Sequence, residues 1–415
     1  MSAKVQPLPP DPLSVFRPLV EGIGGLDQAD RVRRGATLLQ TLPRPPVGLT
    51  PHRVIHRQNK LVVRYYAPDP AKAAGRPVVV VPSMINRAYI VDLEPDRSMV
   101  GALAAAGHPT YLVDWGVPGP EDAQDDVGHV LLTLLRRSID RIRRHARELQ
   151  RASQRASQRA SLPASERAAS ADRGSELPQV HLLGYCQGGT LSAMYAALRP
   201  QDVAGLVALN APVRFSQGGR FADFVASGHF DVEQAISPDA LVPVEVMKVA
   251  FKLLDPMGNW TKHLAIEQAS HDPKALARTL ARERWLEENV PMPGTFARQF
   301  IRAAYQEDRL LAGTWVVRGQ PVDLRRITCP VLVAACQRDF ISPKEACLPL
   351  AQATGSADVT TEVLQTGHIG VVVGGFGPKV FFPMLDRWFR RVDGGRPPVA
   401  PARPGEGGDD ARGDL

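Results

Sequence analysis

Residues 180–198 read VHLLGYCQGGTLSAMYAAL, and the pattern changes in the middle of this run. The apolar residues up to Gly184 predict a buried strand, and the residues from Gly188 onward predict a helix. A G-x-C-x-G turn with Cys186 at its centre joins the two. A nucleophile on such a sharp turn has a strained backbone, so glycines are needed where strand and helix nearly touch. The pattern therefore predicts Cys186 as a nucleophile presented by a tight strand-to-helix turn.

The surroundings of this turn suit a reactive thiol. A helix N-terminus beside the sulfur favours the thiolate. The backbone N–H of Gln187 is expected to form half of an oxyanion hole. We expect the other half from the loop after an earlier strand, PSMIN at 82–86, through the N–H of Met84 or Ile85. The competing interpretation of any cysteine is a small buried hydrophobe, which we expect for Cys329 and Cys336.

A cysteine nucleophile needs a base, and the base needs a group that orients it. Asp339 follows the predicted strand of VLVAACQRDF, and His368 follows the next one in VLQTGHIG. Taken singly, Asp339 also fits a helix cap and His368 a surface loop. The chain order of nucleophile, acid and histidine, each after a strand, predicts a Cys186–His368–Asp339 triad.

The remaining pattern alternates strands and helices. Apolar runs predict strands at 61–66 (taken as an edge strand), 77–82, 110–115, 179–184, 205–211, 330–335 and 359–365. Helical periodicity is found at 96–106, 125–147 and 381–391, with a short helix near 28–42. This alternation predicts an α/β chain with a mainly parallel central sheet, and the turn at Cys186 specifies the α/β-hydrolase fold.

Composition shifts suggest how the chain is divided. Residues 1–50 are interpreted as an N-terminal arm, and 51–214 with 319–393 as the α/β core. Residues 215–318, which have helical patterns and little strand character, are interpreted as an inserted cap. The repeat RASQRASQRAS begins a polar insertion, 149–177, predicted to be a solvated and disordered loop or a polar extension of the preceding helix. Residues 394–415 are rich in Pro and Gly and are predicted to be a disordered tail.

Composition also narrows the class of protein. A hydrophobic content of 44% and a charged content of 22% are ordinary for a globular protein. Eleven arginines and five acidic residues lie within 136–176, so this segment accounts for nearly all of the net charge of +7. The rest offers no broad basic face for nucleic acid, and no aromatic residues interleave the arginines, although an RNA-binding tail stays an alternative for that segment. We expect no signal peptide, transmembrane helix, metal or cofactor, and cytoplasmic reduced thiols.

Several motifs in order resemble the polyhydroxyalkanoate synthases, over roughly residues 55–390. The motifs are the N-R-x-Y-x-x-D-L-x-P-x-x-S segment at 86–98, DWGVP at 114–118, GYCQGGT at 184–190, APVRFSQGGRFADF at 211–224, RWLEENVPMPGTFARQFIRAAYQEDRL at 284–310, and GHIG at 367–370. The short N-terminal region is most similar to the class III catalytic subunit. The chain departs from the family pattern at Phe340, where a histidine usually follows the acid, at 237–243, and in the insertion at 149–177.

The resemblance implies an acyltransferase that polymerises (R)-3-hydroxyacyl-CoA into polyester and releases CoA. It implies Cys186 as acyl acceptor, His368 as the base that activates it and Asp339 as the third member. The implied partners are the growing chain, the granule surface, a non-catalytic synthase subunit and a second copy of the chain. The triad alone leaves open whether His368 or Asp339 deprotonates the attacking hydroxyl. It equally fits a polyester depolymerase or thioesterase, whereas a granule-associated scaffold would be expected to have a broken triad.

Overall fold

The computed structural model describes residues 25–73, 75–161, 176–228, 230–254 and 258–394. Its centre is an eight-stranded sheet in the order β1-β2-β4-β3-β5-β6-β11-β12. The strands from β4 to β12 in this order run parallel, and β2 is antiparallel to both β1 and β4. The predicted α/β-hydrolase fold with a mainly parallel sheet is therefore confirmed. The strand bounds are β1 Arg53–Gln58, β2 Leu61–Tyr66, β3 Val78–Val81, β4 Thr110–Asp114, β5 Val180–Tyr185, β6 Val203–Leu209, β11 Val331–Cys336 and β12 Val359–Leu364.

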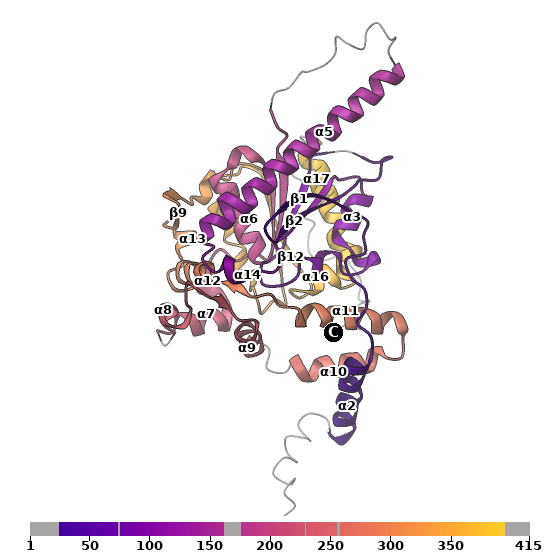
Figure 1. Cartoon of the computed structure of the whole chain (residues 1–415), viewed down its shortest axis with the longest axis vertical. Helices are drawn as coiled ribbons and strands as arrows, with labels where there is room; N and C mark the ends of the chain where they lie inside the picture. Colours follow the sequence, from indigo (N-terminus) through magenta and orange to yellow (C-terminus); the bar gives the residue numbers. More distant parts are fainter. Residues whose placement is uncertain (1–24, 74, 162–175, 229, 255–257, 395–415) are drawn as a thin grey trace, which may run out of the picture.

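Helices cover both faces of the sheet (Figure 1). Successive strand side chains point to opposite faces, so each strand contributes to two cores. Val79 and Val81 of β3 pack in the cluster that contains α5 (Arg136–Ser161) and α6 (Gln187–Leu198). Val78 and Val80 pack in the cluster with α3 (Met99–Ala105) and α17 (Phe382–Gly394). Burial on both faces explains why these strands are apolar throughout.

The chain between β6 and β11 is mainly helical. It contains α7 Gly219–Ala226, α8 Val232–Ala235, α9 Val244–Leu254, α10 Gly258–Ala269, α11 Pro273–Glu287, α12 Gly294–Phe300, a π-helical turn Ile301–Gln306 and α13 Arg309–Ala312. Two short strand pairs join it, β7 (Leu241–Val242) with β8 (Met292–Pro293) and β9 (Val316–Val317) with β10 (Gln320–Pro321). The boundaries of the cap at 215 and 318 stay a prediction.

The described part of the N-terminal arm contains α2 (Gly25–Thr41), which packs on α10 below α11 (Figure 1). A Cβ at Gly35 would lie 1.9 Å from the His263 carbonyl oxygen, so the two helices cross in near contact there. Arg31 donates to Glu267 of α10 across the same interface at 2.8 Å. Shorter helices complete the fold: α4 Val127–His129, α14 Lys344–Cys347, α15 Leu350–Ala353 and α16 Gly370–Val373.

Two expectations about local structure need correction. Residues 61–66 form a strand, but β1 covers its outer side, so β2 is not the edge. Because β1 is mostly polar (RVIHRQ), apolar periodicity did not reveal it. The helix expected at 125–147 is interrupted by a π-helical turn, Val130–Leu135, and then continues to Ser161.

The start of the predicted polar insertion is thus an extension of the preceding helix, exposed at 151–155 and projecting from the body (Figure 1). The remaining parts of the predicted arm, insertion and tail, at 1–24, 162–175 and 395–415, lie outside the described residues. Among the described residues, no helix is long and apolar enough to cross a membrane.

Candidate active site

Cys186 lies between the end of β5 and the first residue of α6, as the G-x-C-x-G pattern predicts. Its backbone has φ 57° and ψ −132°, a conformation rarely adopted by a residue with a side chain. The flanking glycines allow it. A Cβ at Gly184 would lie 2.4 Å from the Gly189 Cα, and one at Gly188 would lie 2.1 Å from the Val81 carbonyl oxygen. The close approach of β3, β5 and α6 therefore requires these glycines.

Asp339 and His368 meet at the same edge of the sheet. They follow β11 and β12, which are parallel neighbours, so the carboxyl ends of the two strands lie side by side. The distance from His368 Nδ1 to Asp339 Oδ2 is 2.6 Å. Asp339 Oδ1 accepts hydrogen bonds from the N–H groups of Ile341 at 2.9 Å and Ser342 at 2.8 Å. The carboxylate is thus fixed from both sides and can orient the imidazole.

His368 lies close enough to Cys186 for the sulfur to contribute to the pKa of the imidazole, so all three predicted residues gather in one place. Burial of the ring opposes its charged form. The negative charges of Asp339 and Cys186, together with the hydrogen bond to Asp339, outweigh burial and raise the pKa of His368 to about 10. A histidine that retains a proton beside a cysteine is the electrostatic arrangement that activates a thiol.

The three other thiols differ from Cys186 in their surroundings. Burial raises the pKa of Cys329 and of Cys336 to about 12, and it raises the pKa of Cys347 well above its ordinary value. The buried-hydrophobe interpretation of Cys336 agrees with its position inside β11, while Cys329 is partly buried just before that strand. Cys186 is partly exposed and lies at a helix N-terminus, so it is the best placed of the four to react.

Two residues that the sequence did not single out hold the His368 backbone. The Tyr185 hydroxyl donates to the His368 carbonyl oxygen at 3.0 Å, and the Asn210 Nδ2 donates to the same oxygen at 3.4 Å. The Tyr185 and His368 rings lie 5.2 Å apart between centroids. Asn210 Oδ1 in turn accepts from the Cys336 N–H at 2.9 Å. The only available signal was position, because Tyr185 and Asn210 stand at the carboxyl ends of the two central strands.

The expected oxyanion donors lie together beside the strand-to-helix turn at Cys186, which we call the elbow. The N–H groups of Met84 and Ile85, however, donate to side chains. The Met84 N–H donates to Gln187 Oε1 at 3.2 Å, and the Ile85 N–H donates to Ser83 Oγ at 3.3 Å. The Gln187 N–H is among the first of α6 and has no intrahelical acceptor. These positions fit an oxyanion hole formed by Gln187 and Met84, which stays a prediction.

The loop that carries Met84 and Ile85, residues 82–87, is fastened to the end of α11. The Val290 N–H donates to the Ile85 carbonyl oxygen at 2.9 Å, and Asn86 pairs with Asn289 as a β-bridge. Trp285 Nε1 donates to the Arg87 carbonyl oxygen at 2.8 Å. We call these contacts the α11 seam.

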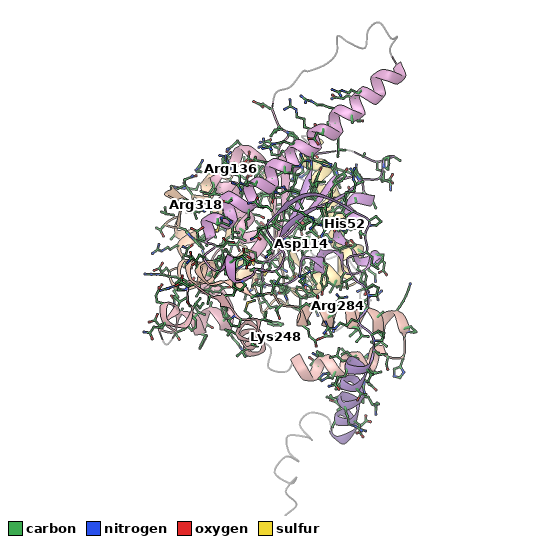
Figure 2. The ribbon with its side chains drawn as sticks, in the orientation of Figure 1. His52, Asp114, Arg136, Lys248, Arg284 and Arg318 are labelled. Carbon is green, nitrogen blue, oxygen red and sulfur yellow. The ribbon has the colours of Figure 1, made fainter. Side chains whose placement is uncertain are left out.

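The seam continues beyond the loop. The Tyr89 hydroxyl donates to Glu288 at 2.9 Å, and the guanidinium of Arg284 lies over the Tyr89 ring, 5.8 Å from its centroid. Figure 2 labels Arg284 at α11. Asp92, from the same sequence motif, accepts from Thr50 at 2.5 Å and Ser98 at 2.7 Å. The motif at 86–98 thus ties the arm, the core and α11 together.

Three aromatic side chains of the helical segment pack together, and one of them, Tyr305, lies near Cys186. Burial, followed by the charges of Cys186 and Cys347, raises the pKa of the Tyr305 phenol, which places Tyr305 near the site. Its ring lies 4.8 Å from that of Phe215 and 5.0 Å from that of Phe221. Phe340, the departure from the family pattern, is 53% exposed and leaves the carboxylate bonds of Asp339 intact.

Comparison with known proteins agrees with this geometry. Residues 173–374 match a model described as the alpha/beta hydrolase fold, and residues 45–103 match one described as the N-terminus of poly-beta-hydroxybutyrate polymerase (PhaC). The chain is 30% identical to the poly(3-hydroxyalkanoate) polymerase subunit PhaC of Allochromatium vinosum, over 88% of this chain and 95% of that protein.

It is also 30% identical to the corresponding subunit of Haloferax mediterranei, over 87% of this chain and 68% of that protein. Among solved structures, it is similar to a monoacylglycerol lipase of Paleococcus ferrophilus, with 16% identity, a TM-score of 0.43, and coverage of 80% of this chain and 99% of that one. With the elbow, the acid and the histidine in place and two thirds or more of each PhaC relative covered, the chain belongs to the PhaC family of poly(3-hydroxyalkanoate) polymerases.

Proposed function

We propose that this protein polymerises (R)-3-hydroxyacyl-CoA into polyhydroxyalkanoate through an acyl-cysteine intermediate, with release of CoA. One observation carries the proposal: His368 bonds Asp339 through Nδ1 at 2.6 Å near Cys186, which stands on a strained turn at the start of α6. The named PhaC relatives supply the class of product.

In the first step, the proton of the Cys186 thiol already resides on His368, whose raised pKa retains it, and the sulfur attacks the thioester carbonyl carbon. A C–S bond to Cys186 forms, and the C–S bond to CoA breaks. The departing sulfur of CoA takes the proton back from His368. One thioester replaces another, so the step is close to thermoneutral, which suits a thiol nucleophile better than a hydroxyl.

In the second step, the hydroxyl oxygen of another 3-hydroxyacyl unit attacks the acyl-cysteine carbonyl carbon. The ester C–O bond forms, the C–S bond to Cys186 breaks, and the hydroxyl proton passes through the base to regenerate the starting Cys186–His368 pair. We assign the removal of the hydroxyl proton to His368 rather than to Asp339. The Asp339 side chain has no exposed surface, and its oxygens are already occupied by His368 and by two backbone N–H groups. His368 is the base that lies near the sulfur, where the acyl group would be attached.

Water must be kept from the acyl-cysteine, because hydrolysis would release the hydroxy acid. We assign this exclusion of water to the aromatic group of Tyr305, which lies near Cys186, with Phe215 and Phe221 packed against its ring. Asp308 fastens this aromatic group. It accepts from the Phe215 N–H at 2.8 Å and from the Ser216 hydroxyl at 2.6 Å, and so joins the start of the helical segment to its later part.

The test uses the full chain with (R)-3-hydroxybutyryl-CoA, measures CoA release with a thiol reagent and identifies the product. We expect insoluble polyester, loss of all CoA release in Cys186→Ala, and normal release in the control Cys329→Ala, which removes a thiol at the far end of β11. Free hydroxy acid without polymer would identify a depolymerase or thioesterase with the same triad. If the wild type releases no CoA from thioesters of any acyl chain length, either alone or with a class III partner subunit, the scaffold role is favoured.

The resemblance to class III subunits also leads us to propose a second copy of the chain, a non-catalytic subunit and the granule surface as partners. Light scattering of the purified chain, with and without such a subunit, measures the first two. Sedimentation with washed polyester granules measures the third.

A further inference from the structure

The side-chain oxygen of Gln187 accepts from one of the N–H groups that are expected to bind an oxyanion. This oxygen, Oε1, accepts from the Met84 N–H at 3.2 Å and lies 3.5 Å from Ser83 Oγ. Ser83 Oγ in turn accepts from the Ile85 N–H at 3.3 Å. Gln187 is only 7% exposed, so its carboxamide is held beside the loop rather than in solvent. Both loop N–H groups expected to serve as donors are therefore occupied by side chains.

We propose that the Gln187 carboxamide is a gate on the oxyanion hole. Its carbonyl oxygen stands in for the oxygen of a thioester and remains on the Met84 N–H until that oxygen displaces it. This gate presupposes the acyl transfer proposed above and adds a role for a side chain whose backbone alone was expected to contribute.

The gate lets the oxyanion hole stabilise the transition state more than the bound substrate. A thioester carbonyl that displaces Gln187 exchanges one neutral hydrogen bond for another, so substrate binding gains little from the hole. An oxyanion forms a charge-assisted bond, which is about twice as strong as a neutral one, so it displaces the carboxamide readily. The hole then contributes where charge develops, and this is the condition for accelerating a reaction.

Gln187→Met tests the gate, because methionine has a similar length and a much weaker acceptor. With the Met84 N–H released, a thioester gains a hydrogen bond at no exchange cost, so KM is expected to fall by about threefold to tenfold. In Gln187→Met, kcat/KM therefore rises because KM falls, while kcat stays the same. Gln187→Glu should do the opposite, because a carboxylate holds the N–H by a charge-assisted bond and raises KM by about tenfold or more.

A matched control is Gln337→Met, which removes an exposed carboxamide that bonds Lys344 at 2.8 Å. A second readout is binding of an alkyl trifluoromethyl ketone, which forms a tetrahedral adduct with a cysteine thiol and places an oxyanion in the hole. Its affinity, followed by ¹⁹F NMR, should rise in Gln187→Met, fall in Gln187→Glu and stay constant in the control.

The two proposals fail in different ways. If both Gln187 substitutions leave the ketone affinity unchanged while the wild type still turns over thioester, the gate is refuted. The proposed acyl transfer is then unaffected. A lower kcat with unchanged KM in Gln187→Met also overturns the gate and makes Gln187 a support for the loop. If no thioester is turned over but the ketone series follows the expected order, the gate stands and the proposed substrate is wrong.

Discussion

Substituting Gly188 by alanine tests whether the spacing at the elbow sets catalysis. The new Cβ would lie 2.1 Å from the Val81 carbonyl oxygen and 2.5 Å from that of Pro82, whereas real Cβ contacts lie above 3.0 Å. The obstructing atoms are backbone, so α6 and the end of β3 must separate by roughly 1 Å. This shift moves the N–H of Gln187 away from that of Met84. A misplacement of about 1 Å costs about a hundredfold in rate.

The expected cost in stability is smaller. Overpacking of this kind costs about 1–3 kcal/mol, against a total stability of about 5–15 kcal/mol for a folded domain. We therefore expect Gly188→Ala to stay folded in a thermal unfolding experiment while its kcat/KM for CoA release falls about a hundredfold. Gly375→Ala is the control, because nothing lies within 4 Å of its Cβ position. A Gly188→Ala enzyme within about threefold of wild type would refute the assignment of the oxyanion hole to this spacing.

Three further outcomes follow from the titrating groups. Asp339→Asn removes the charge that raises the pKa of His368 to about 10, so the pKa should fall in an NMR titration and kcat should drop by about 10²–10⁴-fold; an unchanged pKa would contradict the pairing. That raised pKa stabilises the fold fully below pH 6.5 and the effect is lost as pH rises toward 10, so the variant should lose stability mainly in neutral and acidic solution. Iodoacetamide at pH 8 should label Cys186 first, because burial raises the pKa of the other three thiols; mass spectrometry that finds another site first would contradict this. Burial raises the pKa of Asp393, but bonds to His181 and Arg76 outweigh burial and lower it. The contribution of Asp393 to stability is therefore present above about pH 3.8 and lost as the pH falls below that value. An acid-unfolding curve that Asp393→Asn leaves unchanged would rule out this contribution.

The sequence was most informative where burial constrains composition. Strands β3, β4, β5, β6 and β11 are covered on both faces, so they appear as apolar runs, and each predicted run overlaps an observed strand. The triad positions could be predicted because parallel strands end at one edge, which brings residues after β5, β11 and β12 together regardless of their separation along the chain. The spacing of the glycines also located Cys186, because the backbones approach so closely on either side of it that only glycine fits there.

The sequence was least informative where contacts join distant segments through polar groups. Strand β1 is polar and half exposed, so period-2 hydrophobicity did not reveal it. Tyr185 and Asn210 act through the His368 carbonyl oxygen, a partner that only the folded chain brings near. The side chain of Gln187 likewise acquires its role from a loop about a hundred residues earlier. None of these contacts leaves a periodic pattern.

The α11 seam couples the position of helix α11 to the position of the loop that carries the Met84 N–H. Val290, Asn289 and Trp285 hold the backbone of residues 85–87, immediately after the Met84 N–H. If α11 swings outward to admit a bulky thioester, it must either break these hydrogen bonds or pull the loop with it. In both cases the Met84 N–H would be displaced from its position beside Gln187. Under such a movement, the seam would couple the position of α11 to that of the 82–87 loop, so the Met84 N–H would regain its present place only when the helix returns.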